Sequence, residues 1–169
     1  MDAFLAIASK RDVRDYADRP IPDEVRARIL DAGRLAGSAR NRQPWRFLVV
    51  ESAERRDQLA EAVYEPRNVR GAAVVVAIVT DGGTGALDVG RAMQNMFLAA
   101  WNDGFVSCPN GVRDADAAAA ALSLEGDEKP VIILSFGYPA RPRDPESRPA
   151  SDWSRRANRK ALEALVRRL

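Results

Sequence analysis

Two apolar segments constrain the fold of this chain more than any other feature. Residues 72–79 read AAVVVAIV, and residues 131–136 read VIILSF. Strands that are continuously apolar and rich in β-branched residues are buried on both faces. We therefore expect an α+β fold in which a central mixed or antiparallel sheet is flanked by helices.

The remaining elements follow from periodicity and from capping residues. We expect a further strand at Trp45–Val50. The residues from Tyr138 to Ser154 are rich in Pro, Arg, Asp and Ser, which is typical of an extended arm. All 169 residues then form a single domain, 1–169. The predicted helices cover Asp2–Ser9, Asp23–Gly37 with Asp23 as its cap, Ala53–Tyr64, Ala86–Asp103, a segment opening at Asp114, and Arg159–Leu169.

Composition excludes several kinds of chemistry. The chain has no histidine and a single cysteine, Cys108, which excludes Ser-His-Asp and Cys-His nucleophiles, His-ligated zinc and CxxC redox sites. A net charge of +2 does not favour nucleic acid as a partner. No apolar run is long enough to cross a membrane, and the N-terminus is a poor signal peptide. Because a single cysteine cannot form an intramolecular disulfide, we expect a cytoplasmic protein. Because histidine is absent, we expect no metal site.

Positive charge is concentrated in two short segments. Lys10, Arg11 and Arg14 fall within five residues around Asp12, and Arg155–Lys160 forms a second cluster near the C-terminus. Arginine and lysine side chains in such clusters bind phosphate through charge-assisted hydrogen bonds. The alternative interpretation is a solvated turn and a solvated arm, and for the second cluster an acidic partner.

Two loops combine turn residues with polar side chains. The first, residues 38–45, contains Ser38, Asn41 and Gln43, whose donors and acceptors suit the edge of a planar heterocycle. The second, residues 104–111, is expected to be a tight turn that presents backbone N–H groups. Its Cys108 has no histidine to activate it and is interpreted as a packed side chain. For the first loop the alternative is an ordinary capped loop with a buried tryptophan, Trp45.

A glycine-rich segment at residues 81–85 follows the first apolar strand. It invites comparison with the dinucleotide-binding pattern G-x-G-x-x-G. However, Asp88 stands where the third glycine would be, so a plain turn is the better interpretation.

Taken together, the motifs resemble the FMN-dependent nitroreductase family. The resemblance covers nearly the whole chain and rests on the basic N-terminal segment, SARNRQPWRF, GRAMQNMFLAAWNDG, GFVSCPNG, the strand ending in FGYP and the basic C-terminal arm. The spacing S-x-x-N-x-Q-P-W is the strongest single element. The chain departs from the family pattern at Asp12, where a small donor is usual, and at Gly37, where proline is common.

The resemblance implies a bound FMN at the interface of an intertwined homodimer whose C-terminal arms are exchanged. It assigns the FMN phosphate and ribityl chain to the first basic segment, and the flavin ring to the two loops. A cation of the C-terminal arm, Arg156 or Arg159 with Lys160 as a neighbour, meets the phosphate. The implied cofactor-binding residues are Lys10, Arg11, Asp12, Arg14, Ser38, Asn41, Gln43, Cys108, Pro109, Asn110, Gly111, Arg156 and Arg159.

The family's chemistry implies an NAD(P)H-dependent oxidoreductase. NAD(P)H would reduce the flavin at N5, leave, and be replaced by a nitroaromatic, a quinone or a similar acceptor, in a ping-pong sequence without a catalytic side chain. Two alternatives stay open: a family flavoprotein with dehydrogenase or dehalogenase chemistry, and a flavin-storing or flavin-free binding protein.

Overall fold

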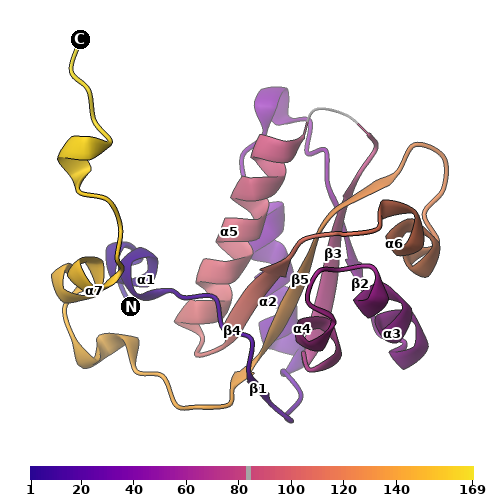
Figure 1. The fold of residues 1–169 in the computed structure, drawn as a ribbon, viewed down its shortest axis with the longest axis horizontal. Coiled ribbons are helices and arrows are strands. Elements are labelled where there is room, and N and C mark those ends of the chain that lie inside the picture. The colour runs from indigo at the N-terminus through magenta and orange to yellow at the C-terminus, as the bar shows by residue number, and fades with distance from the viewer. Residues whose placement is uncertain (83–84) are drawn as a thin grey trace. The chain divides into compact units, whose positions relative to one another are not determined.

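The computed structural model describes residues 1–82 and 85–169. The chain divides into two compact units, which are described separately. The sheet unit comprises residues 11–142, and the terminal unit comprises residues 1–10 together with 143–169. The expected helices and strands of the sheet unit can be followed in Figure 1.

The sheet unit is built on five strands that pair antiparallel in the order β1-β5-β3-β2, with β4 also paired to β5. The two apolar runs form its centre, because β3 and β5 pair over most of the length of β3. The antiparallel form of the predicted sheet is confirmed. The strands are β1 (Tyr16–Ala17), β2 (Arg46–Val49), β3 (Val74–Thr80), β4 (Val106–Asn110) and β5 (Lys129–Pro139).

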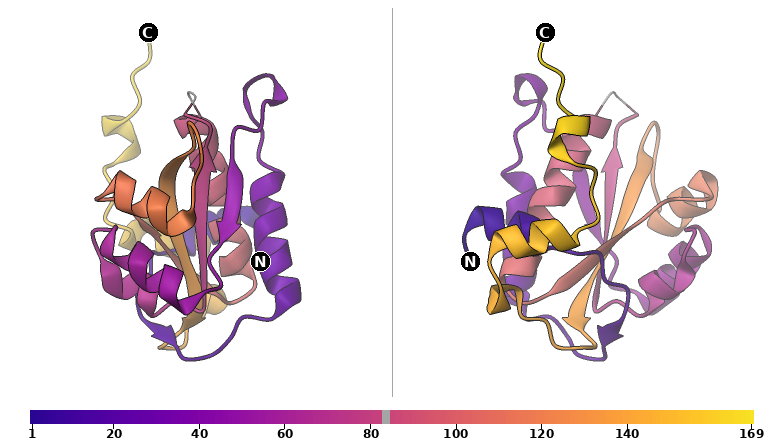
Figure 2. Two further views of the ribbon diagram at one scale, coloured as in Figure 1. Left: turned by 90° about the vertical axis from the view of Figure 1, so that its right-hand side faces the viewer. Right: turned by 60° about the vertical axis from the view of Figure 1, so that its left-hand side comes forward.

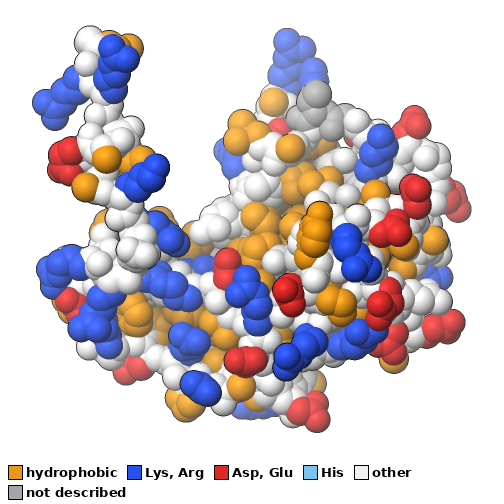
Figure 3. Space-filling model, viewed as in Figure 1, with side chains coloured by type: hydrophobic (Ala, Val, Ile, Leu, Met, Phe, Trp, Pro, Cys, Tyr) orange, Lys and Arg blue, Asp and Glu red, His pale blue; other side chains and the backbone are white. Residues whose placement is uncertain are grey.

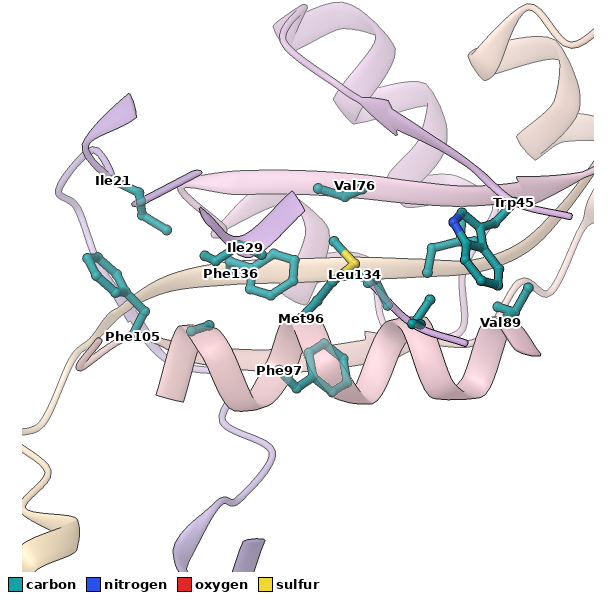
Figure 4. Close-up of a cluster of buried hydrophobic side chains, with 14 residues drawn as sticks. Ile21, Ile29, Trp45, Val76, Val89, Met96, Phe97, Phe105, Leu134 and Phe136 are labelled. Carbon is teal, nitrogen blue, oxygen red and sulfur yellow. The ribbon is translucent and has the colours of Figure 1, made fainter. Parts of the chain in front are cut away.

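Helices cover both faces of this sheet, as the left view of Figure 2 shows. One face carries α2 (Asp23–Arg34) and α5 (Ala86–Asn102), and its core is drawn in Figure 4. The other face carries α3 (Ala53–Glu61), α4 (Pro66–Arg70) and α6 (Ala115–Leu122). Because side chains alternate along a strand, Val76 and Ile78 enter the first core and Val75 and Ala77 the second. Burial on both faces explains why the central runs are continuously apolar.

Local signals explain most helix ends. The N-caps Ser52 and Asp114 accept backbone N–H groups at the starts of α3 and α6. Gly104, with φ +84, follows α5 and reverses the chain, as predicted for a glycine after a helix. The prediction that Asp23 caps α2 is wrong: Pro22 is the N-cap and makes no side-chain bond, so Asp23 lies inside the first turn.

The terminal unit pairs α1 (Ala3–Ser9) with α7 (Ala150–Arg156). The helix predicted over Arg159–Leu169 is wrong, because only a short 3₁₀ turn at Leu162–Ala164 forms there. Asn158, with φ +50, ends α7, and no side chain caps the turn that follows. An isolated helix of this length is marginal without packing, which accounts for the irregular end. A 3₁₀ turn at Pro145–Ser147 precedes α7.

Within the described residues, no helix has the length and apolarity needed to cross a membrane.

Candidate functional site

The first basic segment runs beside β4. Asp12 forms a parallel bridge with Ser107, and the N–H of Val13 donates to the carbonyl of Ser107 at 3.1 Å. The Val13 side chain is buried in a small cluster with Trp101 and Val106. Residues 11–14 are thereby fixed along the outer edge of the sheet, next to the segment that was predicted to face the flavin.

The segment predicted as a tight turn at residues 104–111 is for the most part a strand, β4. The turn prediction is wrong for this part because β4 forms by pairing with the distant β5. Along a strand, the backbone hydrogen-bonding groups of successive residues point alternately to its two sides. Since the carbonyl of Ser107 points to the outer edge, the backbone carbonyl of Pro109, two residues later, points there too. Proline has no N–H to leave unpaired there, which suits an edge strand.

Two side chains of β4 that were predicted to bind the cofactor, Cys108 and Asn110, are buried. Cys108 is fully buried, as predicted for a packed side chain. The Asn110 amide is buried as well, and its Nδ2 donates to Ser135 Oγ at 2.8 Å and to the carbonyl of Ile133 at 3.1 Å. Cys108 and Asn110 can therefore meet a ligand only through their backbone.

Gly111, directly after β4, is held by a neighbouring segment. Its carbonyl accepts the N–H of Tyr64 at 3.2 Å, and the Tyr64 ring packs against its Cα. Its own N–H has no partner among the described residues. Gly111 thus presents an exposed backbone donor at the end of β4.

A cavity of about 770 Å³ opens beside this edge. It reaches β4 through Asn68, whose Nδ2 lies 3.9 Å from Cys108 Sγ. Neither Arg14 nor Arg67 has an ion-pair partner among the described residues, whereas Arg70 binds Asp57 and Glu61. The lining residues are Arg14, Asp15, Tyr16, Glu65, Arg67, Asn68, Arg70, Gly71, Ala140 and Arg141.

Arg67 was not predicted from the sequence. It lies on α4, a five-residue helix that the apolar pattern did not reveal. Pro66 at the first helical position, with two arginines behind it, was the available signal.

Tyr16 closes the cavity toward the core. Its hydroxyl is buried without a hydrogen bond of normal geometry, although Ser135 lies close by. Burial, and secondarily Cys108, raises the pKa of Tyr16 well above its usual value. The hydroxyl is therefore neutral at physiological pH and is poorly suited to deliver a proton.

The loop at residues 38–43 is ordered by its own polar side chains. Ser38 Oγ accepts the N–H of Gln43 at 2.8 Å, and Gln43 Nε2 donates to Asn41 Oδ1 at 3.2 Å. The three predicted residues are thus brought together. Trp45 is buried and stacks on Phe47 at 6.5 Å between ring centroids.

Within the sheet unit the loop at residues 38–43 and the strand that follows the basic segment lie at opposite ends. The loop between α2 and β2 is at the top of Figure 1, whereas β1, which follows the basic segment, is at the bottom. The views of Figure 2, which keep the same vertical axis, agree. At the tip of the loop Lys and Arg side chains gather in Figure 3, where Arg40 and Arg42 are exposed. One chain therefore does not bring this loop to β1, the strand that follows the basic segment.

Several residues predicted to bind the cofactor lie outside the sheet unit. Lys10, Arg156, Arg159 and Lys160 belong to the terminal unit, so their convergence on a phosphate stays a prediction. In the glycine-rich segment at residues 81–85, Gly83 and Thr84 lie outside the described residues. Among the described residues, no group of three or more Cys, Asp or Glu side chains is arranged to hold a metal ion.

Comparisons with known proteins give the chain its family. A protein of Methanothermobacter thermautotrophicus, provisionally named NADH dehydrogenase/NAD(P)H nitroreductase, is 30% identical over 150 residues, which cover 83% of this chain and 78% of that protein. A solved nitroreductase family protein of Clostridium difficile 630 superposes with a TM-score of 0.82 at 23% identity, covering 99% of this chain and 98% of its own. An FMN-dependent nitroreductase of Clostridium difficile R20291 gives a TM-score of 0.78 at 23% identity, covering 90% and 94%. The sequence profile of the nitroreductase family matches residues 7–82 and 67–138. The chain belongs to the nitroreductase family.

Proposed function

We propose that the protein is an FMN-dependent oxidoreductase that takes hydride from NAD(P)H and reduces nitroaromatics, quinones or similar electron-poor acceptors by a ping-pong route. The observation that carries this proposal is the pairing of Asp12 with Ser107, which fixes the basic segment beside the first residues of β4. A phosphate-binding segment and a free backbone edge are then neighbours on one rigid sheet. Membership of the family, and the oxidoreductase names of the relatives, support the same conclusion.

The residues at this edge fit FMN chemically. A phosphate needs cations and N–H donors, and Arg14 and Arg67 offer guanidinium groups without ion-pair partners among the described residues. The cavity of about 770 Å³ lies within the usual range for small-molecule sites, about 300–1,000 Å³. Arg11 and Arg14 would hold the phosphate and ribityl end, joined by Lys10 and by Arg156 or Arg159 of the terminal unit. The backbone at Pro109 and Gly111 would face the ring.

When bound, FMN would supply the hydride-transfer chemistry between NAD(P)H and the acceptor. The chain supplies orientation and charge. Arg14 and Arg67 stabilise negative charge beside the cavity, and the N–H of Gly111 is a preorganised donor at the end of β4. Tyr16 is a poor proton donor, because burial raises its pKa, and we propose that protons come from solvent.

The divided site supports a homodimer with exchanged arms. The loop between α2 and β2, which carries Ser38, Asn41 and Gln43, lies at the opposite end of the sheet unit from β1, and we propose that a second copy brings this loop to the flavin. The apolar side chains near the C-terminus are exposed and would be covered by the partner: Leu162, Leu165, Val166 and Leu169. The single cysteine agrees with a reducing compartment and supports our proposal of a cytoplasmic enzyme.

Steady-state kinetics test the activity directly. The FMN-saturated protein is assayed with NADH or NADPH against a nitroaromatic and a quinone at several concentrations of each. Parallel double-reciprocal lines are expected, because the donor leaves before the acceptor binds. Intersecting lines would contradict the ping-pong route. The absence of turnover with every donor and acceptor would contradict the enzyme assignment.

A further inference from the structure

The loop at residues 38–43 is held in an unusual backbone conformation. Arg40, Asn41 and Gln43 have φ values of +53, +54 and +50. Non-glycine residues rarely adopt this left-handed region, and three within four positions need support from their surroundings. The internal bonds of the loop join its residues to one another but do not attach it to the rest of the molecule.

Asp88 provides an attachment. Its side chain is only 12% exposed, and Oδ2 accepts the backbone N–H of Ala39 at 3.1 Å. The other carboxylate oxygen lies 3.6 Å from a guanidinium nitrogen of Arg91. Asp88 is in the first turn of α5, so a buried carboxylate on a rigid helix holds the loop at its second residue.

Two glycines let the loop approach this helix closely. A Cβ on Gly37 would lie 2.4 Å from a guanidinium nitrogen of Arg91, and a Cβ on Gly85 would lie 2.9 Å from Pro44 Cγ. The Gly37 backbone at one end of the loop and the Pro44 ring at the other therefore pack against the N-terminal part of α5. Gly37, where the family usually has another residue, makes room for the arginine that pairs with Asp88.

We propose that Asp88 is a positioning residue that fixes the left-handed conformation of residues 38–43 and so makes this loop competent to bind flavin. The inference rests on the proposed function for its ligand, but the effect on the loop is independent of it. Asp88 is also the residue that stands in place of the third glycine of the dinucleotide-binding pattern, and the proposal explains why an aspartate is useful at this position. A purely structural alternative is that Asp88 only stabilises α5 through its position near the helix N-terminus.

Three variants distinguish these roles. Asp88→Ala removes the acceptor, whereas Asp88→Asn keeps an oxygen that can accept the N–H of Ala39. Asp103→Ala is the matched control, because Asp103 follows α5 at its other end, is also 12% exposed in its side chain, and pairs with Arg28 at 3.1 Å. For each protein we would measure amide hydrogen exchange at Ala39 and at Val76, and the dissociation constant of FMN by fluorescence titration.

In Asp88→Ala we expect exchange at Ala39 to accelerate at least about tenfold while Val76 stays protected, and FMN affinity to fall about 10- to 100-fold, as for loss of a charge-assisted hydrogen bond. Asp88→Asn should recover most of both, and Asp103→Ala should change neither. Unchanged exchange at Ala39, or equal loss of FMN affinity in Asp88→Ala and Asp103→Ala, would overturn the inference. A wild-type protein that binds no FMN would contradict the proposed function, and the exchange at Ala39 would still decide whether Asp88 fixes the loop.

Discussion

Val13 and Ser107 are joined by a backbone hydrogen bond of 3.1 Å that fastens the basic segment to the outer edge of β4. The two residues are far apart in sequence, and their pairing places Asp12 between the arginines proposed to bind phosphate. The site proposed for FMN is built on this bond. Asp12 is a carboxylate at the position where, by the resemblance, a small donor is usual.

Asp12→Ser should therefore tighten FMN binding. A carboxylate beside a phosphate dianion is repulsive, and removing an exposed like charge is worth up to about 1 kcal/mol, or up to about fivefold in affinity. Fluorescence titrations with FMN at low and high salt would measure the change, which should shrink as salt screens it. Weaker binding by the serine variant at low salt would show that Asp12 supports the site.

Arg14→Gln and Arg67→Gln should each weaken FMN binding about 10- to 100-fold, because each removes a charged donor from the cavity. Arg26→Gln is the control: Arg26 is paired with Asp23 and Glu51 and does not line the cavity. Equilibrium dialysis with FMN compares the three proteins. If the control loses as much affinity as the cavity variants, the cavity is not where FMN binds.

Tyr16→Phe should leave the protein as stable or stabilise it by about 1 kcal/mol, since it removes a buried hydroxyl without a well-formed hydrogen bond. The ring itself must stay, because the backbones of Gly71 and Gly137 pack against it.

The same substitution should flatten the alkaline end of the stability profile. The pKa of Tyr16 is higher in the folded than in the unfolded chain, where it is about 10. Ionisation of this group therefore leaves the free energy of unfolding unchanged below pH ~10 and lowers it as the pH rises above that value. Urea unfolding at pH 8 and above pH ~10 would measure both effects. A phenylalanine variant that loses more than about 1 kcal/mol at pH 8, or that keeps the full alkaline loss, would contradict this account.

Removing residues 159–169 should weaken the proposed homodimer and, with it, FMN binding. The segment carries exposed leucines that need a covering surface and forms almost no structure of its own. Sedimentation velocity of the full and shortened proteins would show the change in mass, and a Leu162→Ser/Leu165→Ser variant keeps the chain length constant. Dimers of equal stability in all three proteins would exclude the arm as a dimer contact.

The central strands could be predicted because burial on both faces leaves a local mark, an unbroken apolar run. β4 could not, because Pro109 and Gly111 resemble a turn and the strand exists only through its pairing with β5. α4, and with it Arg67, could not be predicted from periodicity either, because five residues are too few to show a helical repeat.

The candidate site divides in the same way. Ser38, Asn41 and Gln43 were found as a motif and do interact with one another, because the bonds that order the loop are local. That Asn110 turns its amide into the sheet, and that Asp88 holds Ala39, depends on elements far apart in the chain. At the C-terminus the apolar spacing of residues 159–169 predicted a helix, but Asn158 ends α7 and residues 159–169 are exposed, so a second short helix there is not stabilised by burial.

The central claim, that this chain is a flavin-dependent NAD(P)H oxidoreductase, is tested most directly by reconstitution with FMN and anaerobic titration with NADH and NADPH, followed by absorbance. We predict a retained yellow flavin spectrum that bleaches stoichiometrically with at least one nicotinamide donor and returns when a quinone is added. A protein that retains no flavin after reconstitution, or a bound flavin that neither donor bleaches, would contradict the claim.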